Sequence, residues 1–351
     1  MSRISHWFSY DNPIFSRFTI EACCDIGSAN CRISLGKKLV FNQPTCLAVH
    51  KQTGEVVAYG QRAHNFLGKT PQSIEIVFPI ENGRVVDRSA FSDLLNILYR
   101  DVLQSTFRGL VVNVQGKFGL AIELSPVEKE IFSKILKNSG FGGMEMIEQN
   151  RGLLELYRRR GPDSSLCILD LGATKAELSI FSLGELVYQK SIDISGNSLN
   201  DEIVNIVRSQ QKIDIGWITA EEIKRQVVLV SDENNKQKER QLIIRGKDML
   251  TNLVRTEKIA SNQFDKLAKN FASRLMDEVQ LALADISAKA VADSMMDGIF
   301  LTGGTSKLQG LAEFLSARLS VEVIKTLHPE TDGVMGLSMM ADGQPPPLHN
   351  K

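Results

Sequence analysis

Residues 25–35 read Asp-Ile-Gly-Ser-Ala-Asn-Cys-Arg-Ile-Ser-Leu, and residues 170–180 read Asp-Leu-Gly-Ala-Thr-Lys-Ala-Glu-Leu-Ser-Ile. The two stretches align without a gap as an acid, an aliphatic residue and a glycine, then small or polar residues, then an aliphatic-Ser-aliphatic strand. An apolar run precedes each acid, so each copy predicts two strands joined by a tight turn. Gly27 and Gly172 supply the backbone freedom that such a turn needs. The copies lie 145 residues apart, too far for a solenoid repeat, and indicate two similar domains in one chain.

Composition excludes several classes of protein. The chain has 351 residues with 41 basic and 41 acidic side chains, so its formal net charge is zero. A nucleic-acid-binding protein would normally carry a basic excess, and no nucleic-acid partner is therefore expected. No run approaches the roughly 20 apolar residues that a membrane-spanning helix needs. Five cysteines without metal-type spacing predict buried free thiols in a reducing cytoplasm.

Hydrophobic periodicity predicts helices and short strands between and after the two copies. Strands are expected at residues 110–114 and 298–302. Ser125, Pro126 and Glu128 form a helix start of the capping-box type. The predicted helices cover residues 89–103, 125–138, 198–207, 219–227, 262–286 and 306–319.

The turns have the chemistry of a phosphate site. Converging backbone N–H groups can bind an anion, and small side chains let it approach closely. The acid that ends each first strand, Asp25 or Asp170, can then hold Mg²⁺, usually through water. Two such hairpins would hold a triphosphate from both sides, whereas each alone could be merely a tight turn. A third element supports the phosphate interpretation, because Gly303 and Gly304 stand between a buried strand and a helix, where a planar ligand can lie against the backbone.

Two Asp-Gly hairpins followed by a late Gly-Gly loop resemble the pattern shared by actins, sugar kinases and heat-shock ATPases. Within that group the chain, from about Cys24 to Ala341, resembles the MreB family of bacterial actins. The similar stretches are Asp25-Ile-Gly-Ser-Ala-Asn30, Val57-Ala-Tyr-Gly-Gln-Arg-Ala-His-Asn-Phe-Leu-Gly-Lys-Thr-Pro71, Pro79-Ile-Glu-Asn-Gly-Arg-Val-Val-Asp87, Ile215-Gly-Trp-Ile-Thr-Ala-Glu-Glu-Ile-Lys224 and Gly298-Ile-Phe-Leu-Thr-Gly-Gly304. The second of these is quite specific.

The resemblance implies an α/β, actin-like two-lobed fold, with duplicated lobes of sheet and helices around a central nucleotide cleft. Residues 1–150 would form the first lobe, with a small subdomain at about 36–85 and with residues 325–351 returning to it. Residues 151–324 would form the second lobe, with a small subdomain at about 196–260.

The resemblance also implies a function. The chain would bind ATP and Mg²⁺, polymerise with itself into membrane-associated filaments, and organise cell shape and wall synthesis with cell-wall or other cytoskeletal partners. It would be cytoplasmic and peripheral at the inner face of the cell membrane. The balanced charge fits a protein whose main partner is itself.

Site residues follow from the matched motifs. The cofactor-binding positions that the resemblance implies are Asp25, Gly27, Ser28, Ala29, Asn30, Asp170, Gly172, Ala173, Thr174, Lys175, Gly196, Glu221, Lys224, Gly303, Gly304, Thr305 and Lys307. Asp25 and Asp170 are the implied metal positions, and Thr305 replaces a third glycine. The second hairpin departs most from the family's Asp-Ile-Gly-Gly-Gly-Thr-Thr-Glu. Thr174 in place of glycine restricts the approach of backbone to phosphate. Lys175 could pair with phosphate charge or block the site.

The catalytic position also departs from the family. There, a Glu before the second hairpin positions the attacking water. In this chain that role falls on Gln149, or on Glu148 if the register shifts. A glutamine can orient a water but is a very poor base. Enzyme activity is therefore open, with a slow ATPase as the possible form.

An aromatic N-terminus suggests membrane contact. Ile4, Trp7 and Phe8 share one face of a helical turn, as in an interfacial anchor. Phe107 lies where the family carries a second hydrophobic insertion. The alternative is an N-terminal segment that packs onto the body of the protein.

Two other classes stay open. A non-hydrolysing scaffold with a degenerate ATP site would account for the changes at residues 173–176 and at Gln149. A small-molecule kinase of the same superfamily is less favoured, because only about 50 residues separate the first hairpin from Asp87, which matches the small actin-type lobe.

Overall fold

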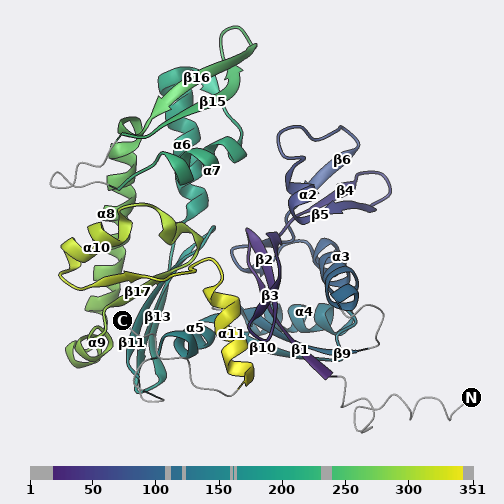
Figure 1. The fold of residues 1–351 in the computed structure, drawn as a ribbon, viewed down its shortest axis with the longest axis vertical. Coiled ribbons are helices and arrows are strands. Elements are labelled where there is room, and N and C mark those ends of the chain that lie inside the picture. Colours follow the sequence, from purple (N-terminus) through teal and green to yellow (C-terminus); the bar gives the residue numbers. More distant parts are fainter. Residues whose placement is uncertain are drawn as a thin grey trace, which may run out of the picture. The chain divides into compact units, whose positions relative to one another are not determined.

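The computed structural model describes residues 19–106, 112–120, 124–158, 161, 164–230 and 239–342. The chain divides into two units (Figure 1). Unit 1 is Met1–Leu156 with Gly333–Lys351, and unit 2 is Tyr157–Asp332. The chain therefore passes between the units twice, once at each end of unit 2.

A five-stranded sheet with the order β10-β9-β1-β2-β3 forms the centre of unit 1. The first three strands in the sequence make an antiparallel meander, and the last two run parallel to β1 at its other edge. The strands are β1 (Thr19–Ile26), β2 (Asn30–Leu35), β3 (Lys38–Pro44), β9 (Asn113–Leu120) and β10 (Gly143–Glu148).

Helices α3 (Arg88–Ile97) and α4 (Pro126–Lys137) contribute to the main core of unit 1. The rings of Phe91 and Phe132 lie 4.8 Å apart between centroids. They belong to the same buried cluster as Phe118 of β9, so the core of unit 1 joins these helices to the sheet.

A second, smaller cluster lies on the other side of β1. Strand residues alternate between the two faces of a sheet, and Cys23 accordingly packs with Val334 and Leu337 while its neighbours join the main core. The two valine and leucine side chains come from α11 (Asp332–Asp342), the last described helix, and α5 (Gln149–Tyr157) packs beside it. The C-terminal helix is thus part of unit 1 and faces the strand that carries Asp25.

Smaller sheets complete unit 1. A three-stranded sheet has the order β5-β4-β6, and β7 pairs with β8 in a short hairpin. These elements are β4 (Leu47–His50), β5 (Val56–Tyr59), α2 (Gly60–His64), β6 (Ile74–Val77), β7 (Ile80–Glu81) and β8 (Arg84–Val85).

The sheet of unit 2 repeats the topology of unit 1. Its order is β13-β12-β11-β17-β18, again an antiparallel meander with two strands added in parallel. The repeat in the sequence is therefore a repeat of structure. The strands are β11 (Leu166–Leu171), β12 (Ala176–Ser182), β13 (Glu185–Ile192), β17 (Ile299–Thr302) and β18 (Val323–Lys325).

Helices pack around this second sheet in one large buried cluster, and a separate three-stranded sheet has the order β14-β15-β16. In Figure 1 the β15–β16 hairpin lies at one end of unit 2 and α9 at the other. The elements are α6 (Gly196–Gln211), β14 (Ile213–Asp214), α7 (Trp217–Gln226), β15 (Gln241–Asp248), β16 (Val254–Ala260), α8 (Asp265–Ala284), α9 (Ala288–Ser294) and α10 (Leu311–Leu319).

The predicted helices exist, with different ends. The helix expected at 89–103 is α-helical to Ile97 and continues as a π-helix, Leu98–Gln104. The helices expected at 262–286 and 306–319 are each preceded by a 3₁₀ turn, Ser261–Phe264 and Gly304–Lys307. The capping box of Ser125 and Glu128 is present as predicted.

The strand expected at 110–114 was misplaced, because β9 begins at Asn113 and continues to Leu120. The sequence did not indicate a strand at residues 113–120 because two glycines lie inside it, and Gly is rare in strands. They serve close packing here: a Cβ at Gly116 would overlap the ring of Phe118, and one at Gly119 would lie 2.9 Å from Leu337 Cδ1. The prediction of buried free cysteines is confirmed for all five.

Candidate phosphate-binding hairpins and the residues around them

Both predicted turns close with the same hydrogen bond. In the first, the Gly27 N–H donates to the Asn30 carbonyl at 3.0 Å, and in the second the Gly172 N–H donates to the Lys175 carbonyl at 2.9 Å. Neither glycine has a positive φ, so the backbone freedom expected of them is not the reason for their presence. The reason is space: a Cβ would lie 3.2 Å from the Asn30 oxygen or 2.9 Å from the Lys175 oxygen.

Neighbouring segments hold the first turn in place. The Ala29 carbonyl accepts a hydrogen bond from the Thr45 N–H at 2.9 Å. The Ser28 hydroxyl accepts one from the Gly83 N–H, in the β7–β8 turn, at 3.3 Å. The first hairpin is therefore fixed to the small sheets of unit 1.

The second turn is fixed to the start of α6. The Gly172 carbonyl accepts from the Gly196 N–H at 3.2 Å, and the Ala173 carbonyl accepts from the Asn197 N–H at 2.8 Å. The Thr305 hydroxyl also donates to the Gly172 carbonyl, at 2.9 Å. Thr305 replaces a glycine of the family pattern, and its side chain gains a bond that glycine could not make.

Gly303 brings the third predicted element against the second hairpin. Its φ is 82°, a conformation that favours glycine. A Cβ there would overlap Asp170 Oδ1 and the Leu171 carbonyl. Gly304 has open space around it, so only the first of the two glycines is required by packing.

Glu221 and Lys224, predicted beside the adenosine, are ion-paired across one turn of α7 at 2.6 Å. Lys224 Nζ also donates to the Gly196 carbonyl at 3.0 Å, and Asn200 Nδ2 donates to Glu221 Oε2 at 2.8 Å. Burial lowers the pKa of the Lys224 ammonium, and the Glu221 carboxylate opposes this shift. Asn200 was missed by the sequence analysis, although it lies one helical turn after Gly196 on α6, where i, i+4 residues share a face.

The two predicted lysines differ in their surroundings. Lys307 is ion-paired with Glu330 at 2.8 Å and its side chain is half exposed. Lys175 is partly exposed and has no ion pair with any described residue. Lys175 therefore keeps its charge available at the second turn.

Gln149 and Glu148 occupy different environments. Gln149 begins α5, directly after β10, and its amide lies against Gly333, where a Cβ would overlap Nε2 and come 3.1 Å from Asp25 Oδ2. Gln149 is thus placed beside Asp25. Glu148 pairs instead with Arg151 at 3.6 Å, and its side chain is 44% exposed.

Asp25 does not have the surroundings of a metal ligand. Its carboxylate is buried and accepts from Arg32 Nη1 at 3.4 Å. Burial raises the pKa of the Asp25 carboxyl, and the Arg32 guanidinium opposes that rise. In the described part of the chain, no group of three His, Cys, Asp or Glu side chains could hold a metal ion. A cation already faces Asp25, so these residues do not fit Mg²⁺ held by Asp25.

The residues expected at a membrane, Ile4, Trp7, Phe8 and Phe107, lie outside the described residues. Among the helices that the structure describes, none is long and apolar enough to cross a bilayer.

Solved structures with this architecture define its class. MreB5 of Spiroplasma citri bound to ADP superposes with a TM-score of 0.85 at 24% identity, covering 93% of this chain and 97% of that one. The MamK double helical filament gives 0.76 at 15% identity, covering 93% of this chain and 100% of the other. The fold is therefore actin-like, as the sequence predicts.

Sequence comparisons identify the family. The chain is 26% identical over 331 residues to the cell shape-determining protein Mbl of Bacillus subtilis (strain 168), covering 93% of this chain and 96% of that protein. It is 24% identical over 331 residues to the cell shape-determining protein MreB of Escherichia coli (strain K12), covering 90% and 91%. The family model MreB/Mbl protein matches residues 19–345, and the chain belongs to that family.

Proposed function

We propose that this chain is an ATP-binding cytoskeletal protein that polymerises into filaments at the inner face of the cell membrane. There it would organise cell shape and wall synthesis with cell-wall or other cytoskeletal partners. The observation that carries the proposal is the duplicated hairpin, in which the same glycine-closed turn ends the first strand of the meander in both units. Relatives support it, since MreB5 structures are bound to ADP and AMPPNP, and MamK forms a double helical filament.

In this proposal the backbone of residues 27–30 and 172–175 binds phosphate oxygens, and Lys175 adds a positive charge. Gly303 and Gly304 face the nucleotide, and the cluster of Glu221 and Lys224 binds the adenosine. Mg²⁺ remains a prediction for Asp170. When bound, the metal would neutralise part of the phosphate charge.

Hydrolysis is proposed to be slow. In this proposal Gln149 orients the attacking water but cannot take its proton, because an amide is a very poor base. Glu148 is occupied by Arg151 and half exposed, which makes it a poor substitute. The lack of a good base at positions 148 and 149 also favours the second candidate, a scaffold that binds ATP without hydrolysing it.

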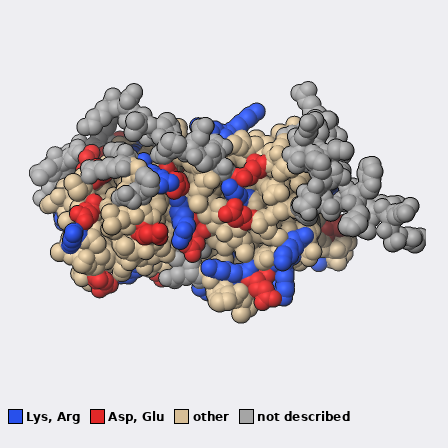
Figure 2. Space-filling model, turned by 90° about the horizontal axis from the view of Figure 1, so that it is seen from below, with Lys and Arg blue, Asp and Glu red and all other residues tan. Residues whose placement is uncertain are grey.

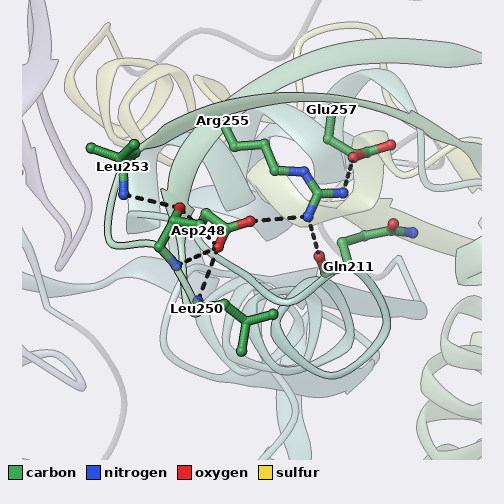
Figure 3. A network of polar contacts seen from close by, with 7 residues as sticks. Gln211, Asp248, Leu250, Leu253, Arg255 and Glu257 are labelled. Atoms are coloured by element: carbon green, nitrogen blue, oxygen red, sulfur yellow. Dashed lines mark hydrogen bonds and ion pairs between the residues drawn. The ribbon is translucent and has the colours of Figure 1, made fainter.

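The β15–β16 hairpin supports self-association. Its tip is strongly apolar and exposed: Leu250 is 84% exposed, Val254 81% and Leu253 69%. The turn is nevertheless ordered, because Asp248 Oδ1 accepts from the Leu250 and Thr251 N–H groups at 2.9 Å each (Figure 3). An ordered apolar tip costs little conformational entropy when it binds a partner.

Arg255 ties this turn to its surroundings. Its guanidinium contacts Asp248 at 3.2 Å and Glu257 at 2.5 Å, and donates to the Gln211 carbonyl at 3.2 Å (Figure 3). Three other cations, Arg245, Lys247 and Lys258, are exposed and belong to no ion pair that the described residues make. The hairpin therefore presents apolar and basic side chains together.

The other end of unit 2 has the complementary character. Residues 277–297, from the second half of α8 through α9, contain five acids and one lysine. Exposed apolar side chains accompany them, with Leu281 59% and Met296 65% exposed. Because the two patches lie at opposite ends of one unit (Figure 1), a contact between copies would be head-to-tail and would extend as a filament.

Net charge does not point to a membrane surface. The formal net charge is zero, and the face drawn in Figure 2, which is seen from below, carries basic and acidic side chains interspersed. Membrane association is therefore proposed to depend on the apolar side chains of Ile4, Trp7, Phe8 and Phe107 rather than on net charge.

Sedimentation tests the proposal. With ATP and Mg²⁺ the full chain should pellet as filaments that are visible by electron microscopy, and should bind ATP. A protein that stays monomeric under all nucleotide and lipid conditions would contradict filament formation. Phosphate release that depends on an added sugar would favour the kinase.

Charge reversal tests the proposed contact. Arg245→Glu with Lys247→Glu should abolish pelleting and leave ATP binding intact. Reversal of two exposed lysines of unit 1, Lys37 in the β2–β3 turn and Lys38 at the start of β3, should leave pelleting unchanged. Adding Asp277→Lys and Asp285→Lys to the hairpin variant should restore pelleting. Normal pelleting of the hairpin variant would exclude this contact.

A further inference from the structure

Asp25, the acid of the first hairpin, faces an arginine on the neighbouring strand. Asp25 of β1 and Arg32 of β2 are register partners, so their side chains share one face of the sheet. Arg32 Nη1 and Asp25 Oδ2 lie 3.4 Å apart, and the two side chains are only 13% and 7% exposed. A buried cation is therefore built into the strand pair that carries the first turn.

The second copy of the repeat shows that the fold does not require this arginine. Asp170 has Glu177 as its register partner, at the position that corresponds to Arg32. Glu177 Oε1 accepts from Gln189 Nε2 at 2.8 Å. Two acids face each other in unit 2, whereas unit 1 has an acid and a base. The two hairpins have the same backbone pairing, but the residue opposite the acid is basic in the first, Arg32, and acidic in the second, Glu177.

Arg32 also has a donor to spare. Its Nε is buried and has no hydrogen-bond partner in the part of the chain that the structure describes. A buried N–H without an acceptor is costly, and a guanidinium is suited to phosphate, which it binds through several N–H groups at once. A phosphate oxygen beside the first turn would satisfy this donor.

A divalent ion is disfavoured at the same place. Asp25 is the carboxylate that could attract it, and the guanidinium already neutralises that charge. A second cation a few ångströms from a buried guanidinium would be repelled, because charges interact strongly where water is excluded.

We propose that Arg32 is the resident cation of the first hairpin, that Asp25 orients it, and that this chain therefore binds the nucleotide triphosphate without needing Mg²⁺. The inference rests on the proposed binding of ATP. It concerns which group supplies positive charge to the phosphates at the first hairpin, and it assigns that role to a side chain instead of a metal. A metal at Asp170 of the second hairpin would add to binding but would not be required for it.

Calorimetric titration of the full chain with ATP, in excess EDTA and in excess Mg²⁺, tests the inference. For the unmodified protein the two dissociation constants should agree within about threefold. Arg32→Leu should weaken binding in EDTA by about tenfold or more, because a charge-assisted contact is lost, and Mg²⁺ should restore much of it. Arg32→Lys should keep part of the ATP binding seen in EDTA, since the positive charge remains but the several N–H donors of the guanidinium are lost.

Lys117→Met is the matched control. Lys117 lies in the same sheet, is 15% exposed and pairs with Glu21 at 3.1 Å. Its loss removes a partly buried cation of the same sheet, with its pairs to Glu21 and Glu145, and it should change stability without making ATP binding depend on Mg²⁺. If Arg32→Leu does not fold, Asp25→Asn with Arg32→Gln removes both charges together and takes its place.

The outcomes separate the two proposals. Binding by the unmodified protein that requires Mg²⁺, or an Mg²⁺ response unchanged by Arg32→Leu, would overturn the inference and leave ATP binding standing. No binding under either condition would overturn the proposed ATP binding and the inference with it.

Discussion

The phenol of Tyr157 donates a hydrogen bond to the carboxylate of Asp332, 175 positions further along the chain. These are the first and last residues of unit 2, at the two points where the chain passes between the units. The same carboxylate oxygen accepts from the hydroxyl of Thr302, at 2.7 Å, and from that of Thr326. The Tyr157 ring stacks on Phe300 with centroids 5.0 Å apart. Both crossings are therefore bound to each other and to the end of β17.

Tyr157→Phe should lower the free energy of unfolding by about 1–2 kcal/mol, because it removes one donor from a buried carboxylate and keeps the stacked ring. Urea unfolding monitored by circular dichroism measures the change. Tyr188→Phe is the control, since its bond to Asp285 at 3.2 Å is exposed and should matter less. Equal effects from the two substitutions would contradict the structural role of Tyr157.

The same residue predicts a dependence on pH. Burial, and then the charge of Asp332, raise the pKa of the Tyr157 phenol well above its ordinary value of 10.0. A group whose pKa is raised on folding contributes stability that is complete below the unfolded pKa and is lost above it. The stability of the unmodified protein should therefore fall more steeply above pH 10 than that of Tyr157→Phe. Parallel curves would show that Tyr157 does not titrate in this way.

Adjacent glycines give a test of the second hairpin. Gly303→Ala should destabilise the protein by about 2–4 kcal/mol and weaken ATP binding, because its backbone is left-handed and a Cβ would overlap Asp170. Gly304→Ala meets nothing within 4 Å and should be close to neutral in stability. Thermal unfolding and ATP titration of both variants measure the difference. A neutral Gly303→Ala would mean that the loop does not lie against the hairpin.

The part of the fold that is local in sequence could be predicted, because turns, caps and hydrophobic periods are encoded within a few residues. The hairpin at Asp25 and the capping box at Ser125 are examples. The hydrogen bond between Tyr157 and Asp332 could not be predicted, because no local sequence pattern near either residue indicates a partner so distant in the sequence.

Two features of the candidate site were accessible in principle. Arg32 follows from counting along the hairpin, because a turn closed between Gly27 and Asn30 sets Asp25 opposite Arg32. In the sequence, Thr305 indicates only the loss of a glycine, although a hydroxyl beside a hairpin can also gain a carbonyl partner. Comparison with the family pattern shows which residue is missing. It does not show which contact the new side chain makes, because that contact depends on packing in three dimensions.

Asp248→Asn should loosen the tip of the β15–β16 hairpin. Hydrogen bonds from the turn and from Arg255 lower the pKa of the Asp248 carboxyl to about 2, so it is a carboxylate at neutral pH. An amide loses the charge that strengthens these bonds. Hydrogen exchange at the Leu250 and Thr251 amides should therefore become faster in the variant. In the unmodified protein, the protection of these two amides should decrease as the pH falls below about 4, because the Asp248 carboxylate becomes protonated. Unchanged exchange would mean that the strand pairing alone orders the tip.

Gln149→Glu should raise the rate of phosphate release from ATP by about tenfold or more, since a carboxylate can accept a proton from the attacking water and an amide cannot. Glu148→Gln is the matched control at the adjacent position, and it should leave the rate unchanged because Glu148 faces Arg151. Both variants should bind ATP like the unmodified protein, which titration checks before the rates are compared. If Gln149→Glu binds ATP and releases phosphate no faster, the side chain at position 149 does not face the attacking water, and the non-hydrolysing scaffold becomes the better description of this chain.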